Sequence, residues 1–152
     1  MNTVYETEAS LISNRIDRDL HELAWKQLQR PIHPPQQIIL PCTTLQGLYR
    51  IHHKNDLMYI GVGNLNARRT RHVSVFKNKG KPIQKKNGSS SDSPVARKMY
   101  HKDKNLDNWY FSWQTIDGEI DRDIAMFVMS RMELILGKQL KPALCTEHML
   151  GK

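Results

Sequence analysis

Hydrophobic positions near the N-terminus recur at helical spacing. Apolar side chains share one face of residues 4–30, at Ile12, Ile16, Leu20, Leu23, Ala24 and Leu28. Pro31 ends this pattern, and the proline-rich residues 31–35 predict a stiff, extended connector. We expect the helix to pack on the core of the following domain. An arm that mediates dimerisation is the alternative.

Alternating positions predict three strands further along the chain. Residues 45–52 and 57–61 alternate on either side of residues 53–56, which contain the turn residues Asn55 and Asp56, so they predict a β-hairpin. Residues 109–116 place Trp109, Phe111 and Trp113 on one side and polar residues on the other. This pattern predicts a third strand with one buried face.

Capping residues predict the remaining helices. Asn64 or Asn66 can begin a helix that runs to about residue 76, and Ser93 can cap one that starts at Pro94. Asp121 or Asp123 can begin a long helix to about residue 140. The intervening residues 77–93 are rich in Lys, Gly and Ser without an apolar period, which indicates a mobile basic loop.

The order of elements predicts an α/β (α+β) fold. Its core is a small, three-stranded, mainly antiparallel sheet flanked by helices, preceded by an extra N-terminal helix. We divide the chain into an N-terminal helical arm and linker, residues 1–44, and one domain, residues 45–152. The length of 152 residues and the 39% of hydrophobic residues suit such a domain.

Several function classes are disfavoured by composition. No apolar run approaches the roughly 18 residues of a membrane span, and the N-terminus lacks a basic start followed by an apolar stretch. Cys42 and Cys145 do not have the spacing of a zinc site or a disulfide framework. These observations favour a reduced, cytoplasmic protein without a membrane partner.

Positive charge is concentrated in the middle of the chain. The net charge is +8, and residues 50–104 hold 14 Lys or Arg against three Asp or Glu. The two flanking thirds carry slightly more acidic than basic residues. Such segregation is typical of a protein that binds a polyanion, and we favour nucleic acid over a merely solubilising surface.

Three features add candidate chemistry. Residues 47–49 read GLY and residues 59–61 read YIG, although Tyr and Gly are also common in structural hairpins. Residues 64–72, NLNARRTRH, place Arg68 and His72 on one helical face, which suits phosphate binding. Glu133 has mostly apolar helical neighbours, so its carboxylate needs either a divalent metal or an ion pair with a distant Lys or Arg.

The ordered set resembles the GIY-YIG nuclease superfamily. GLY, YIG, an arginine on the next helix and a single glutamate on a later helix occur in that order over about residues 45–145. Within the superfamily, residues 89–113, SSSDSPVARKMYHKDKNLDNWYFSW, are most similar to phage endonucleases and compact restriction enzymes.

The resemblance implies a role for each matching residue. Tyr49 would activate or position the attacking water, and Tyr59 would bond near the scissile phosphate. Glu133 would hold one Mg²⁺ or Mn²⁺. Counting from Gly61 favours Arg69 as the arginine that stabilises charge, whereas aligning Asn64-Leu65, with His72 one helical turn later, favours Arg68.

The surrounding cations would bind DNA. We expect contacts from nine residues: Lys54, Arg71, Lys77, Lys79, Lys81, Lys85, Lys86, Arg97 and Lys98. Nearby arginines and a metal would favour the phenolate form of the tyrosines. The resemblance departs from the family at Cys145, where an asparagine is expected.

The predicted function is a metal-dependent DNA endonuclease that hydrolyses phosphodiester bonds. The main alternative is a non-catalytic nucleic-acid-binding module with the same fold, for which Cys145 is the best support. A basic interaction protein that assembles through its N-terminal helix is the third hypothesis. We also expect a possible homodimer or higher homo-oligomer, formed through that helix or on DNA.

Overall fold

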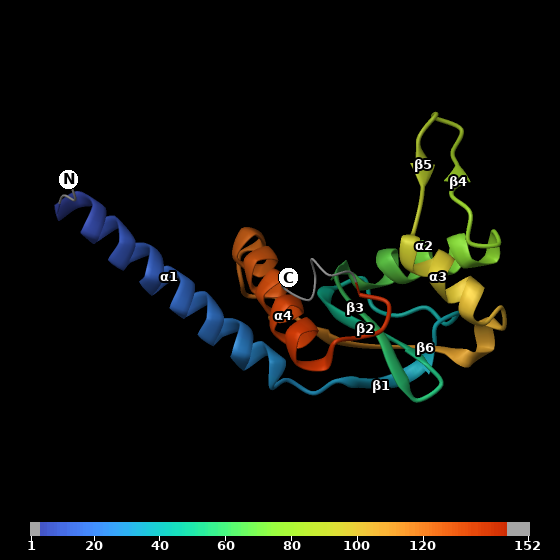
Figure 1. Ribbon diagram of the computed structural model, residues 1–152, viewed down its shortest axis with the longest axis horizontal. Coiled ribbons are helices and arrows are strands. Elements are labelled where there is room, and N and C mark those ends of the chain that lie inside the picture. The colour runs from blue at the N-terminus through green and yellow to red at the C-terminus, as the bar shows by residue number, and fades with distance from the viewer. Residues whose placement is uncertain (1–3, 146–152) are drawn as a thin grey trace.

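The structure is a computed structural model that describes residues 4–145, and the side chains of residues 15–145 (Figure 1). Four α-helices are interspersed with six strands in the described part of the chain. In order they are α1 (Val4–Leu28), β1 (His33–Gln37), β2 (Gln46–His53), β3 (Asp56–Asn64), α2 (Leu65–Lys77), β4 (Ile83–Gln84), β5 (Ser90–Ser91), α3 (Pro94–Lys102), a 3₁₀ turn (Leu106–Asn108), β6 (Trp109–Thr115) and α4 (Arg122–Leu140).

The main sheet has four antiparallel strands in the order β1-β6-β2-β3, where three were predicted. The added strand is β1, which pairs with β6 at the edge of the sheet. Pro34 and Pro35 are tolerated there because an edge strand has one side without ladder bonds. The ring of His33 stacks on Trp113 at 3.9 Å, and Ile38 is fully buried. The boundary predicted at residue 44 therefore falls within the chain that builds the sheet.

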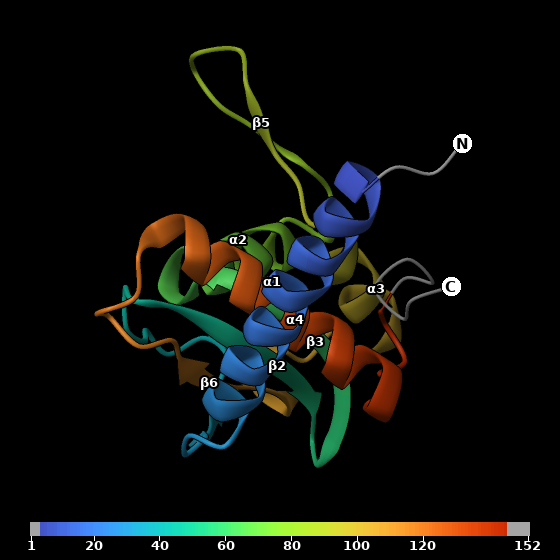
Figure 2. The same cartoon turned by 90° about the vertical axis from the view of Figure 1, so that its left-hand side faces the viewer.

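Helices cover both faces of this sheet. On one face, Tyr49, Ile51 and Phe111 pack against residues of α2 and α3. On the other face, Leu48 and Ile60 pack against α1 and α4. Figures 1 and 2 show the two helix pairs on opposite sides of the strands.

The prediction of one buried face for residues 109–116 is wrong. Ser112 and Gln114 are also buried, and Oγ of Ser112 bonds to Nε2 of His52 at 2.8 Å. Gln114 Nε2 donates to the backbone oxygens of Leu28 and Arg30, and its Oε1 accepts from Arg50 at 2.9 Å. The alternating sequence did not predict this burial, because polar groups with hydrogen-bond partners can be buried as well as apolar ones.

The C-terminal half of helix α1 packs on the domain. Ala24 is fully buried against α4, and Arg131 of α4 pairs with Asp17. Ile16, by contrast, is 55% exposed, and the earlier turns project away from the body (Figures 1 and 2). The expected packing is therefore confirmed for this half of the helix.

Predicted caps position the other helices. Asn64, Ser93 and Asp121 each accept a hydrogen bond from a backbone N–H in the first turn of the helix that follows. Residues 77–93, expected to be a loop, instead contain the short hairpin β4–β5. Within the described part of the chain, no helix has the length and apolar character needed to cross a membrane.

Candidate functional site

The β2–β3 hairpin brings two tyrosines together. Tyr49 pairs with Gly61 across the strands, and the ring centroids of Tyr49 and Tyr59 are 6.1 Å apart. A Cβ on Gly61 would lie 2.3 Å from Cζ of Tyr49, which is closer than packed atoms approach. The glycine of YIG therefore makes room for the tyrosine of GLY.

A histidine and a serine extend this pair into a buried hydrogen-bonded chain. The Tyr49 hydroxyl bonds to Nε2 of His72 at 2.8 Å, and Nδ1 of His72 bonds to Oγ of Ser93 at 2.6 Å. All three residues are buried. Burial, and then the charges of Arg68 and Arg71, lower the pKa of His72 to about 3. The imidazole is therefore neutral at pH 7, with one nitrogen donating and the other accepting.

Within this hydrogen-bonded chain, the contact made by Ser93 is the one that the sequence did not predict. Its Oγ accepts from the N–H of Ala96 at 3.0 Å, which is the predicted cap, and also bonds to His72. The sequence shows the cap through Pro94 but contains no signal for the contact with a helix 21 residues earlier.

Burial has the largest effect on the pKa of both tyrosines and outweighs the charge of Arg68, which favours the phenolate forms as expected. Burial raises the pKa of Tyr49 well above its usual value, and Tyr59 and Glu133 raise it further. Burial, followed by the charge of Glu133, raises the pKa of Tyr59 to about 12. The opposing effect of Arg68 is smaller than the desolvation cost in both cases. Both side chains are neutral phenols at pH 7, and Tyr59 is the more exposed of the two.

Arg68 lies beside the tyrosines, along the end of β3. Gly63 has a φ of +139°, and a Cβ there would lie 2.6 Å from Nε of Arg68. The glycine thus lets the guanidinium lie close to the strand. Arg68 also acts electrostatically on Tyr49, Tyr59 and His72. Arg71 acts on Tyr49 and His72 from the same helix.

Arg69 faces away from this cluster, and its hydrogen bonds hold parts of the fold together. It is 7% exposed, and its Nη1 donates to the backbone oxygen of Ile38 at 2.9 Å. Its Nε and Nη2 donate to Oδ1 of Asn66 at 3.2 and 3.0 Å. Arg69 therefore connects the segment after β1 to α2, and Arg68 is the arginine that lies beside the tyrosines.

Glu133 approaches the tyrosines from α4. It is half-buried, and its charge raises the pKa of Tyr49, Tyr59 and Cys145. Cys145 reaches the same region because the N–H of Leu144 donates to the oxygen of Met58 on β3 at 2.8 Å. The residue that stands at the expected asparagine position is thus close to Tyr59.

The donor set at Glu133 fits magnesium better than zinc. Among residues 15–145, no three His, Cys, Asp or Glu side chains gather as a metal-binding group. Zinc sites usually need three or four such ligands, whereas Mg²⁺ is commonly held by one or two carboxylates, several waters and substrate phosphates. A single carboxylate beside two hydroxyl groups and two arginines is closer to the magnesium type of site.

A groove of about 580 Å³ opens next to the arginines, between α2 and α4. Arg68 and Arg71 form one wall, while Val62, Ile116 and Met129 provide apolar lining. The tyrosines and His72 do not line it, so the groove borders the cluster and leads to Arg68.

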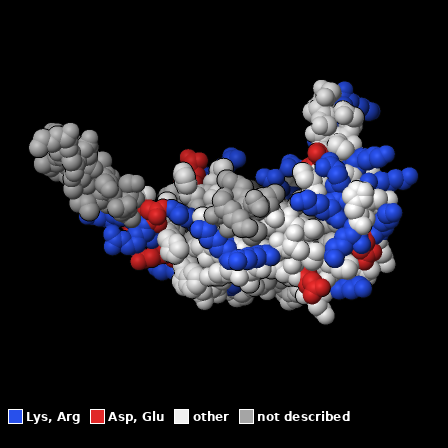
Figure 3. Space-filling view, in the orientation of Figure 1, with Lys and Arg blue, Asp and Glu red and all other residues white. Residues whose placement is uncertain are grey.

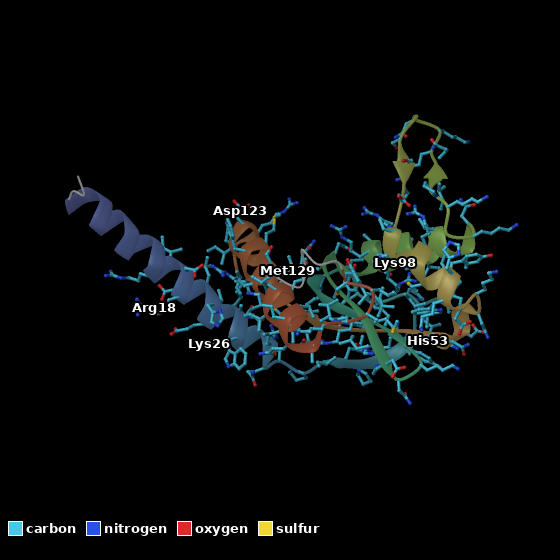
Figure 4. The ribbon with its side chains drawn as sticks, viewed as in Figure 1. Arg18, Lys26, His53, Lys98, Asp123 and Met129 are labelled. Carbon is cyan, nitrogen blue, oxygen red and sulfur yellow. The ribbon has the colours of Figure 1, made fainter. Side chains whose placement is uncertain are left out.

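Apart from Arg71, which lines the groove, the predicted DNA contacts fall into three places. One group is exposed at the end of α2 and along the β4–β5 hairpin, and consists of Lys77, Lys79, Lys81, Lys85 and Lys86. Lys98 is exposed on α3 (Figure 4) and acts on the thiol of Cys145. Arg97 pairs with Asp92 at 2.8 Å. Lys54 lies in the β2–β3 turn, near His53 and at the opposite end of that hairpin from Gly61.

Basic side chains gather over α2, α3 and the β4–β5 hairpin in the space-filling view (Figure 3). Comparison with known proteins adds no assignment, since no protein-family model, curated protein or solved structure matches the chain.

Proposed function

We propose that this protein is a metal-dependent DNA endonuclease of the GIY-YIG type. The observation that carries the proposal is the convergence of Tyr49, Tyr59, Arg68, His72 and Glu133 from two strands and two helices. Their electrostatic influence on one another supports a single site. The excess of positive charge in residues 50–104 supports a polyanionic substrate.

Arg68 and Arg71 would bind the phosphate. Both line the groove beside the tyrosines, and guanidinium groups match phosphate oxygens with paired hydrogen bonds. In hydrolysis, negative charge grows on those oxygens as water attacks. Fixed donors in a partly desolvated site stabilise that charge more strongly than water does.

The two tyrosines would act as hydrogen-bonding phenols, because raised pKa values make them poor bases at neutral pH. Tyr59 is the phenol within reach of a substrate, since Tyr49 is only 2% exposed. Tyr49, held by His72, would then act as a positioning residue for Tyr59. Glu133 would hold Mg²⁺ or Mn²⁺, which supplies Lewis acidity to phosphate oxygens when bound.

The test is cleavage of supercoiled plasmid and single-stranded circles with Mg²⁺, Mn²⁺ or EDTA. We expect metal-dependent cutting by the wild type and at least a roughly hundredfold loss in Glu133→Gln, with DNA binding retained. Tyr59→Phe should also lose activity. Glu22→Gln, an exposed carboxylate on α1, and Tyr110→Phe on β6 are the matched controls.

The alternative is a non-catalytic DNA-binding module with the same fold. Cys145 beside Tyr59 favours it, because the thiol lacks the donor and acceptor groups of an asparagine side chain. DNA binding without cutting by the wild type under any metal condition would establish this alternative. Neither binding nor cutting would reject both proposals.

A further inference from the structure

The most exposed cationic element lies outside the site, in residues 81–92, which we name the finger. It contains the β4–β5 ladder, with Ile83 opposite Ser91 and Gln84 opposite Ser90. The finger projects from the α2–α3 pair in two perpendicular views (Figures 1 and 2). Its tip is a defined turn, since the N–H of Lys85 donates to Ser89 at 2.8 Å and Gly88 has a φ of +84°.

The two ends of the finger are anchored to the body. Asn78 Nδ2 donates to the backbone oxygens of Lys81 and Pro82 at 3.0 and 3.2 Å. On the other side, Asp92 accepts from Arg97 and from the N–H of Ser93, both at 2.8 Å. These bonds at its base fix the direction of the finger, while residues 84–90 are exposed.

Charge indicates the class of partner. Residues 57–91, which include α2 and the finger up to Ser91, contain eight Lys or Arg and no Asp or Glu. The finger's one carboxylate, Asp92 at its base, pairs with Arg97. Apart from Pro82 and Ile83, the finger has no apolar side chain. Such a surface does not suit an apolar protein partner, and it does suit the phosphates of nucleic acid.

The shape and chemistry of the finger favour a duplex over a single strand. Non-specific single-strand binding relies on aromatic side chains on which bases stack, and residues 77–93 contain none. The major groove of B-DNA is roughly 12 Å wide and admits a two-stranded ribbon, whose strands lie about 5 Å apart. The exposed tip carries Gln84, Lys85, Lys86 and Asn87, whose amide and ammonium groups match base edges and phosphates.

We propose that the finger enters the major groove of duplex DNA bound at the site, with Gln84 contacting base edges and Lys85 and Lys86 contacting phosphates or guanine. This inference rests on the proposed nucleic-acid function. Nine residues of α2 separate Arg68 from Lys77, or about 14 Å at 1.5 Å per residue. With α2 lying along the duplex, as the proposal requires, Lys77, which precedes the finger, lies about four base pairs from the phosphate at Arg68, counted at roughly 3.4 Å each.

The first experiment measures binding in EDTA, so that its result does not depend on cleavage. A short duplex and one of its single strands are titrated at several salt concentrations. Lys85→Gln/Lys86→Gln should lower the salt slope for the duplex by about two and affect the single strand less. The control is Lys26→Gln/Lys138→Gln, which removes two exposed cations from α1 and α4. Lys26 lies on α1, away from the finger (Figure 4). This variant should leave the difference in salt slope between duplex and single strand unchanged.

The second experiment identifies the groove. A duplex selected from a random pool is methylated at guanine N7, which lies in the major groove. Methylation a few base pairs to one side of the Arg68 contact should interfere with binding by the wild type. Gln84→Ala should weaken binding to the selected duplex by roughly tenfold and broaden its sequence preference.

The outcomes separate the two proposals. Equal losses on duplex and single strand in the double lysine variant, or insensitivity to N7 methylation, would overturn the finger proposal even if the protein cuts DNA. Duplex-selective loss without any cutting would retain the finger and reject the nuclease. Absence of DNA binding by the wild type would reject both.

Discussion

The buried cluster of Tyr49, His72 and Ser93 contrasts with the finger. The three residues are 2%, 6% and 2% exposed and are joined by hydrogen bonds of 2.8 and 2.6 Å. The finger has two ladder pairs, and residues 84–90 are all exposed. Local stability follows such burial, so the cluster has its geometry set by folding, whereas the finger can adapt to a partner.

This contrast separates two kinds of substitution. Changes in the cluster should alter stability, pKa values and the geometry of the site together, because each group there has lost its contact with water. Changes in the finger should alter binding and salt dependence with little effect on folding.

The largest effect is a pH dependence of stability that originates in His72. Its folded pKa of about 3 lies below the value of 6.5 expected in the unfolded chain, so the unfolded state binds the proton more readily. The contribution is fully present above about pH 6.5 and decreases by about 1.4 kcal/mol per pH unit as pH falls towards 3. Urea unfolding between about pH 7 and pH 4 measures it.

Substitution isolates that contribution from other titrating groups. His72→Gln should flatten the pH dependence of the unfolding free energy, whereas Lys85→Gln/Lys86→Gln on the finger should retain the wild-type dependence. Parallel curves for the wild type and His72→Gln would show that His72 is not the buried neutral base described here.

The next effect distinguishes two neighbouring arginines. Arg68→Gln should reduce cleavage by about a hundredfold, because a fixed donor to the phosphate is lost, and change stability by less than about 0.5 kcal/mol. Arg69→Gln should destabilise the fold by roughly 1–3 kcal/mol, because it breaks buried bonds to Ile38 and Asn66. Plasmid cleavage and urea unfolding test both variants. The reverse pattern would reassign the phosphate contact to Arg69.

Gly61→Ala should produce a smaller, purely steric effect. The added methyl would meet the ring of Tyr49, which is held by His72, so we expect a loss of roughly 1–3 kcal/mol. Gly118→Ala is the control, since a Cβ there has no neighbour within 4 Å. Chemical denaturation compares the two. Equal stabilities would mean that the ring of Tyr49 moves aside at little cost.

Local signals in the sequence predicted much of the fold. Pro94 after Ser93, and Asp121 before an apolar helical pattern, identified two helix starts because caps depend on adjacent residues. Strand β1 was missed because two prolines and three polar residues lack an alternating pattern, and its position depends on pairing with the distant strand β6, whose Trp113 stacks on His33. The ladder in the finger was missed because exposed hairpins need no apolar period.

The site was predictable as a set of residues but not as an arrangement. Spacing could not decide between Arg68 and Arg69, since a helix turns by about 100° per residue and only the packing of α2 fixes which one faces the tyrosines. The neutral state of the phenols also could not be predicted from the sequence. It depends on how completely Tyr49 is desolvated, and desolvation outweighs the arginine charges that the sequence does show.

The smallest effect tests the point where the two regions meet. Ser93 follows the finger directly, caps α3 and bonds to His72, so movement of the finger has a short path to the imidazole. Ser93→Ala should cost about 1 kcal/mol through the lost cap and change the ¹⁵N shifts of the His72 ring. Ser93→Thr should keep both properties. If duplex DNA then changes those ¹⁵N shifts in the wild type but not in Lys85→Gln/Lys86→Gln, the adaptable finger and the rigid cluster are coupled through Ser93. Unchanged shifts in Ser93→Ala would show that Tyr49 alone orients the ring and that the two regions act independently.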